Sequence, residues 1–265
     1  MKKLETNEQV SKPLEYVRLY NSSLVCNLQV TCFISHEQKA NQLKLSSTYN
    51  PMRSTQLLIG ALLMSSGFAY AQDRTSITLP FETHAAYFSR EVASSTVVDP
   101  QVFVLDKNAP AERHWQNIEH VAGERNAHPD DAPDSEIYNA TGSPLGMTLE
   151  EWFRASGSVT LEPCADGRED VKVTLHGLKP GGRFSLFETH FDQKPFEFTP
   201  LDGTGTGNSF SADDQGSASV TLTAPERMTH ANAVLVVYHS DKVTHGKERG
   251  SLGETAHHQL IARLP

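Results

Sequence analysis

The chain has 265 residues, and its 32 acidic side chains outnumber its 23 basic ones, which gives a net charge of −9 with histidine neutral. Before residue 72 lie 7 of the basic and 4 of the acidic residues, so the remainder carries 16 basic and 28 acidic side chains and a net charge of −12. A segment this acidic argues against nucleic acid or an anionic membrane surface as its partner. Its length suits one domain with an N-terminal extension.

A short export signal lies inside the chain rather than at its start. Met52 and Arg53 open a positive region, an apolar run follows at 57–64, and Ala-Tyr-Ala at 69–71 has the small-x-small pattern of a signal peptidase site. The apolar run is too short for a permanent transmembrane helix, which needs about 20 residues. We therefore expect residues 52–71 to be a cleaved signal peptide. The mature chain would start at Gln72, reach the periplasm or the exterior, and not be integral to a membrane.

Residues 1–51 precede this signal and are polar, without sustained periodicity. One interpretation is that Met52 is the true start and the segment is a misassigned or disordered leader. The other is an unusually long cytoplasmic leader. Expression from Met52 alone separates the two, because export would fail only if the leader is needed.

Cysteine is scarce in the exported part. Cys26 and Cys32 precede the signal, so Cys164 alone is exported. This excludes an intrachain disulfide and a cysteine-based zinc cluster in the mature chain. The turn-like surroundings of Cys164 favour a buried or capped thiol over a catalytic one.

The sequence of the N-terminal extension, residues 72–158, predicts strands and a helix. Apolar residues alternate over 77–81 and run together over 102–105, which predicts two strands. Behind Pro110, apolar residues at helical spacing predict a short amphipathic helix over 108–121.

A long loop and a second helix complete this extension. The stretch from Gly123 to Gly146 is rich in turn residues and predicts a loop, and its Asn126–Pro144 portion could dock a protein partner. Thr148 and Glu151 match a capping box, which predicts a second short helix after the loop.

The segment 159–265 predicts a β-sandwich. It contains six short β-branched or aromatic segments separated by Gly, Pro and Asp turns, at 159–161, 171–175, 184–191, 217–222, 234–239 and 259–263. We expect a mainly β fold, an antiparallel Greek-key or immunoglobulin-like sandwich, with the two short helices in the N-terminal extension. The glycine-rich stretch 202–208 lacks the pattern of a phosphate or calcium loop, so we expect a flexible hairpin connection.

Histidine is the main functional clue, because eleven of the twelve histidines follow residue 71. Neutral imidazole is a common ligand of zinc and copper. If the strands that end at His190 and His239 are neighbours, these two side chains could meet loop histidines and bind metal. The candidate ligands are His190, His239, His245, His257 and His258. The alternative is that each histidine is a surface residue or is satisfied by backbone. Adjacent His257 and His258 would point to opposite faces of a strand, so one at most could serve.

The order of motifs over 171–263 resembles the copper/zinc superoxide dismutases. Gly-Leu-x-Pro-Gly at 177–181, a strand that ends in His190, Phe-x-Ala-Asp-x-x-Gly-x-Ala-x-Val at 210–220 and Leu-Val-Val-Tyr-His at 235–239 carry the likeness. The resemblance implies a β-sandwich, with His190 near a copper pair and His239 near the final copper ligand.

The chain also departs from that family. Glu188 stands where the pair's other histidine would be, residues 196–208 hold no histidine, and Cys164 alone cannot form the family's disulfide. The resemblance therefore indicates a fold and not dismutase activity.

No complete catalytic motif is present after residue 71. The sequence lacks a Gly-x-Ser-x-Gly elbow and a His-Glu-x-x-His helix, and His239-Ser240-Asp241 is sequential, whereas catalytic triads are assembled from distant residues. We therefore expect an exported, non-enzymatic binding or structural protein. The alternative is a histidine-ligated copper or zinc binding protein, which could be redox-active. The oligomeric state is open.

Overall fold

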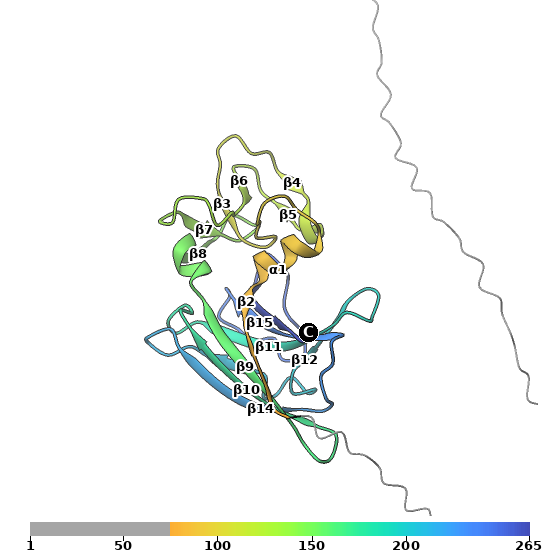
Figure 1. Cartoon of the computed structure of the whole chain (residues 1–265). Helices are drawn as coiled ribbons and strands as arrows, with labels where there is room; N and C mark the ends of the chain where they lie inside the picture. The colour runs from red at the N-terminus through yellow and green to blue at the C-terminus, as the bar shows by residue number, and fades with distance from the viewer. Residues whose placement is uncertain (1–74) are drawn as a thin grey trace, which may run out of the picture. The chain divides into compact units, whose positions relative to one another are not determined.

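A computed structural model describes residues 75–265 (Figure 1). They form a mainly β structure of antiparallel sheets with two short α-helices. The predicted leader at 1–51 and signal peptide at 52–71 lie outside the described residues.

The first sheet has four strands and exposes one face. Its order is β1 (Ile77–Pro80), β9 (Ser156–Pro163), β10 (Glu169–His176) and β14 (Ala218–Ala224). Along β10 the side chains of Val171, Val173 and Leu175 are buried and the residues between them are exposed. This alternation is expected where one face of a strand packs on the core.

The second sheet carries the most apolar stretch after residue 71 at its centre. Its order is β12 (Glu197–Pro200), β11 (Arg183–His190), β15 (Asn232–His239), β16 (Ala256–Arg263) and β2 (Glu82–Thr83), and β13 (Ser209–Ser211) also pairs with β11. All residues of β15 are buried. A strand buried on both faces reads as a continuous apolar run, which is why this stretch stands out in the sequence.

Two hydrophobic cores lie against opposite faces of β15. Val234, Val236 and Tyr238 belong to a large core that also takes in Val171, Val173 and Leu175 of the first sheet. Leu235 and Val237 belong to a smaller core with Phe187, Tyr87 and Ile261. The alternation of a strand places His239 on the same side as Leu235 and Val237.

The strands predicted at 77–81 and 102–105, and all six predicted after residue 158, are confirmed within a few residues. Strands β1 and β2 precede residue 159, yet β1 pairs with β9 and β2 with β16. The start of the described chain therefore contributes to both large sheets.

The predicted helix over 108–121 was wrong. This segment forms the two-stranded ribbon β4 (Glu112–Arg113) and β5 (Glu119–His120) around a short 3-10 turn, η1 (Trp115–Asn117). Gln116 and Asn117 adopt positive φ angles of 51° and 61°, which an α-helix does not allow. The helical spacing of apolar residues reflects tertiary contacts instead: Ile118 packs closely on Gly253.

The predicted loop from Gly123 to Gly146 was also wrong. It contains β6 (Glu124–Asn126), β7 (Glu136–Tyr138) and the start of β8 (Pro144–Thr148), which join β3 (Phe103–Leu105) in the sheet order β6-β3-β7-β8. Strands of three residues are too short to show an alternating pattern, so the turn residues between them dominate the sequence.

One of the two helices was predicted and the other was not. Helix α2 (Leu149–Phe153) begins at the expected capping box, in which Thr148 Oγ1 accepts from the Glu151 amide and the Glu151 carboxylate accepts from the Thr148 amide. Helix α1 (His84–Glu91) follows the N-cap Thr83 and packs on β16. Within residues 75–265, no helix is both long and apolar enough to cross a membrane.

Candidate metal centre

His239 is the last residue of β15, and the fold buries it completely. Its ring Nε2 lies 2.9 Å from Ser185 Oγ on the neighbouring strand β11. Its Nδ1 is also buried but has no hydrogen-bond partner among the described residues. A buried polar atom without a partner is uncommon in folded proteins and calls for an explanation, such as an ion that is bound there.

A chain of hydrogen bonds favours one of the two tautomers of the His239 imidazole. Asn208 donates its amide N–H groups to the carbonyls of Leu186 and Gly246, at 3.2 and 3.4 Å, which directs its Oδ1 toward Ser209. Ser209 then donates to Asn208 Oδ1, and Ser185 can donate to Ser209 Oγ across 3.3 Å.

All of these hydrogen bonds form together when Ser185 donates to Ser209 and its Oγ accepts the N–H of the His239 imidazole. In this arrangement the proton sits on Nε2, and Nδ1 keeps a free lone pair. This is the tautomer that a metal ligand requires. A metal-bound histidine usually donates its other N–H to an oxygen in the same way.

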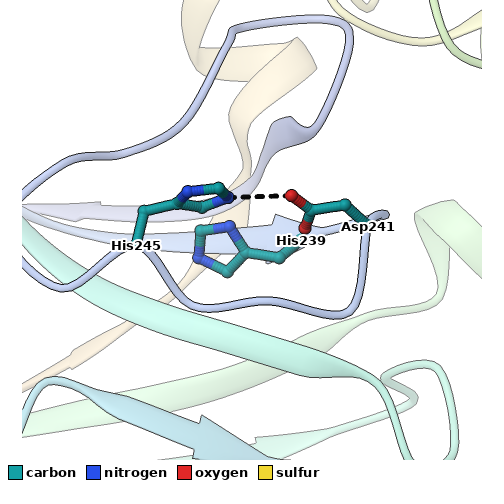
Figure 2. Close-up of side chains that lie close together, drawn as sticks. All are labelled: His239, Asp241 and His245. Atoms are coloured by element: carbon teal, nitrogen blue, oxygen red, sulfur yellow. Dashed lines mark hydrogen bonds and ion pairs between the residues drawn. The ribbon is translucent and has the colours of Figure 1, made fainter.

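Two further ligand groups come from the loop that follows β15. Asp241 Oδ2 lies 2.9 Å from His245 Nε2, and the Val243 amide donates to Asp241 Oδ1 across 3.1 Å. The rings of His239 and His245 have centroids 5.3 Å apart. Figure 2 shows the side chains of His239, Asp241 and His245 gathered together. One ligand atom from each lies within 4.8 Å of the others.

The local backbone explains how three side chains so near in sequence converge. β15 ends at His239, and the chain turns at Lys242, which has a positive φ of 64°. The turn brings His245 back over the strand end. Asp241 and His245 are each about a quarter exposed, with side-chain exposures of 28%. The cluster therefore has one wholly buried ligand and two that solvent can reach.

Burial keeps His239 neutral. Desolvation lowers the pKa of its imidazole to about 4, nearby His245 adds to this effect, and the Asp241 carboxylate opposes it. The ring therefore carries no positive charge near neutral pH that would repel a cation.

The glycine-rich stretch 202–208 contacts this loop through Asn208, which donates to the Gly246 carbonyl, and it directs its backbone amides toward Asp202. Backbone amides of Thr204, Gly205 and Gly207 donate to the Asp202 carboxylate at 2.7 to 3.2 Å. Burial raises the pKa of Asp202, but the hydrogen bonds from Thr204 and these amides outweigh it and lower the pKa to about 2. The amide donors that could have held a phosphate are thus taken by Asp202.

The expectation that His190 and His239 meet was wrong. Strands β11 and β15 are neighbours, as we supposed, but they are antiparallel: His239 pairs with Arg183 and His190 with Asn232. The two histidines therefore lie at opposite ends of the strand pair, about 23 Å apart at 3.3 Å per residue. Instead, the Nε2 atom of His190 lies 2.8 Å from Thr199 Oγ1, and its Nδ1 atom lies 3.2 Å from the side-chain amide nitrogen of Asn232.

His257 and His258 lie on β16 and are buried, and neither belongs to the cluster, although His257 Nε2 lies 3.2 Å from Ser240 Oγ beside it. His257 packs among Trp152 and Tyr238, and its Nδ1 donates to the Gln101 carbonyl across 3.0 Å. His258 contacts His84 and Phe198 on the other face of the strand. The two side chains thus point to opposite faces, as predicted.

The structure brings together two of the five candidate histidines, His239 and His245, and adds Asp241. Asp241 is not among the ligands that the sequence predicts, because His239-Ser240-Asp241 is sequential and so does not match a catalytic triad. The spacing His-x-Asp-x3-His could have pointed to these residues, because a strand followed by a tight turn can fold the third side chain back onto the first.

No protein-family model matches this chain, and no curated protein matches its sequence at a significant level.

Proposed function

We propose that this protein is an exported, non-enzymatic binding protein that holds a Zn²⁺ or Cu²⁺ ion through His239, Asp241 and His245. The observation that carries the proposal is the buried Nδ1 of His239, which lacks a partner in the described chain and lies in a cluster with an imidazole and a carboxylate. Two imidazoles and a carboxylate suit zinc and copper, whereas calcium and magnesium prefer oxygen ligands.

Each side chain has a distinct part in this proposal. Nδ1 of His239 supplies a lone pair from a rigid strand end, while Ser185 fixes its ring. His245 would supply Nε2 in the tautomer that carries its proton on Nδ1, and the Asp241 carboxylate would be the third ligand in place of its present contact with His245. Three protein ligands leave at least one coordination position of the metal for water or another molecule.

The finer description of the fold is part of the proposal. We propose that the two large sheets face each other as an immunoglobulin-like or Greek-key sandwich, which the shared hydrophobic core supports. The likeness to copper/zinc superoxide dismutases is limited to this architecture and to His239 at the end of a central strand. His190 lies too far from His239 to complete that family's copper site.

We propose that the protein acts after export from the cytoplasm. The support is the sequence alone: a signal peptide pattern at 52–71 and the scarcity of cysteine after it. We further propose that a protein partner could use the surface around Asn126–Pro144, which the structure builds from short strands joined by turns.

Metal titration of the purified full chain tests the function. Isothermal titration with ZnCl₂ and with CuCl₂ should show one site in the wild type, and His245→Ala and Asp241→Asn should weaken it at least tenfold. Both changes lie at partly exposed positions, so the fold is expected to persist, which circular dichroism checks. His190→Ala is the matched control and should bind like the wild type. Equal affinities in wild type and His245→Ala would contradict the proposal.

A further inference from the structure

A cavity lies on the far side of β16 from His257, between α1 and strands β11, β12, β15 and β16. It encloses about 320 Å³, within the range of small-molecule sites, which begins at about 300 Å³. Its walls are mainly aromatic and aliphatic, and they include Tyr87, Phe88, Phe191, Phe196 and Phe198. Phe196 is 52% exposed, so the aromatic surface continues from the cavity to solvent.

Two histidines in the wall of this cavity are joined to a half-buried arginine. Arg249 Nη1 lies 3.1 Å from His258 Nε2, and His258 Nδ1 lies 3.4 Å from His84 Nε2. A guanidinium can only donate, so His258 Nε2 accepts and its proton sits on Nδ1. His258 then donates to His84 Nε2, which leaves the proton of His84 on Nδ1.

The chain of donors ends at an N–H group that has no acceptor. His84 Nδ1 is buried and lacks a hydrogen-bond partner within residues 75–265, and so does the hydroxyl of Thr189. Both residues line the cavity. A donor without an acceptor is costly to bury, and both of these groups belong to residues in the wall of one cavity, where the oxygen atoms of a ligand could serve as acceptors.

The charge behind the wall favours an anion. The Arg249 guanidinium stacks on Phe198, 3.4 Å from the ring centroid, and no ion pair neutralises it among the described residues. Glu91 also lines the cavity, but Arg263 lies 3.6 Å from it and balances its charge. Glu248 acts on Arg249 electrostatically but makes no ion pair with it in the described chain, so the cation next to His258 still favours an anion at this end of the cavity.

We propose that this cavity binds a small aromatic carboxylate, with its ring among Phe191, Phe196 and Phe198 and its carboxylate accepting hydrogen bonds from His84 Nδ1 and Thr189 Oγ1. The aromatic walls supply the apolar contact, and Arg249 supplies charge complementarity through His258. This site shares no residue with the metal cluster and does not depend on it.

Benzoate is the probe for the purified full chain, with benzamide and toluene as neutral comparisons. Isothermal titration and NMR should show benzoate binding more tightly than benzamide and benzamide more tightly than toluene. The shifted amide signals should map to α1, β11 and β16. Equal binding of toluene and benzoate, or no benzoate binding at millimolar concentration, would overturn the proposal.

Two substitutions test the donors. Thr189→Val keeps the shape of the side chain and removes an unpartnered buried hydroxyl, so the variant should fold at least as well as the wild type. It should bind benzoate about tenfold more weakly, as loss of a hydrogen bond to a charged group implies. Arg249→Met should reduce the preference for benzoate over benzamide. His176→Ala, at an exposed histidine outside the cavity, is the control and should change neither. Unchanged benzoate affinity in both Thr189→Val and Arg249→Met would refute the assignment.

Discussion

The hydroxyl of Ser185 lies 2.9 Å from Nε2 of His239, and this contact decides which nitrogen of the buried ring is free. Two adjacent antiparallel strands hold the pair, since Ser185 faces Val237 and Arg183 faces His239 in the register of β11 and β15. The relationship therefore belongs to the rigid part of the fold, while Asp241 and His245 belong to the loop.

Ser185→Ala should weaken metal binding while leaving the fold intact. The change removes the acceptor of the His239 N–H, so the ring loses its fixed tautomer and orientation. Loss of such an outer partner typically lowers metal affinity by about 10- to 100-fold. Zinc titration measures it. Ser211→Ala is the control, because Ser211 lies on strand β13, bonds the exposed Arg183 and does not touch the cluster. Equal zinc affinity in Ser185→Ala and wild type would show that the contact has no part in binding.

Gly205→Ala should also weaken metal binding, although Gly205 contacts no ligand group. A Cβ at this position would come 2.6 Å from the backbone of Gly246 and Lys247, and the φ of +75° disfavours any side chain. The loop that carries His245 would have to shift. Gly207→Ala is the control, because its Cβ would meet only Asp202 Oδ2, at 3.4 Å. Zinc affinity should fall in the first variant and stay near wild type in the second, and the reverse order would contradict this account.

The fold should lose stability as pH falls from about 6.5 toward 4. Burial lowers the pKa of His257 from 6.5 to about 4 and that of His84 to about 3. Between the folded and unfolded pKa values the unfolded chain binds more protons, so acid favours unfolding. The loss from His257 alone is on the order of 3 kcal/mol.

Carboxyls whose pKa is raised by burial act in the opposite direction, and Asp99 is the one with the large shift. Burial raises the pKa of Asp99 to about 6, which hydrogen bonds from Gln101 and Trp152 only partly oppose, so the folded chain takes up this proton first and gains stability as pH falls. Urea unfolding at pH 7, 6 and 5 measures the net slope. His257→Asn, which keeps a donor for the Gln101 carbonyl, should flatten the slope; an unchanged slope would show that His257 does not control it.

The capping box of α2 should contribute measurably to stability. Thr148→Ala removes the hydroxyl that accepts from the Glu151 amide, and loss of such a cap costs about 1 kcal/mol. Glu151→Gln keeps an acceptor for the Thr148 amide and should change the free energy of unfolding much less. Urea denaturation of both variants checks the comparison. A larger loss in Glu151→Gln than in Thr148→Ala would be inconsistent with the reciprocal cap.

The sequence predicted those elements whose pattern is local. Strand β15 could be located because a strand buried on both faces is a continuous run of apolar residues. Helix α2 could be located because its capping box is a pattern of two residues three positions apart. The ribbon at β4 and β5 could not, because its conformation depends on contacts such as Ile118 with Gly253, which lie far apart in the chain.

In the candidate site, too, the residues with a local sequence pattern could be predicted and those that depend on long-range contacts could not. His239 and His245 were named because histidines after a buried strand are conspicuous. The sequence also suggests His190, because it does not show whether neighbouring strands run parallel or antiparallel. Strands β11 and β15 are antiparallel, so His190 and His239 lie at opposite ends of the pair. The free Nδ1 of His239 depends on Ser185, Ser209 and Asn208, three residues that carry no metal-binding signal by themselves.

The most direct test of the metal site is the position of the ion. Crystals of the protein grown with Zn²⁺ should give an anomalous difference peak at the zinc edge, about 2.0–2.1 Å from Nδ1 of His239 and Nε2 of His245, with Asp241 as a third ligand. A well-ordered cluster without a peak, or a single peak bound by His190 instead, would contradict the account.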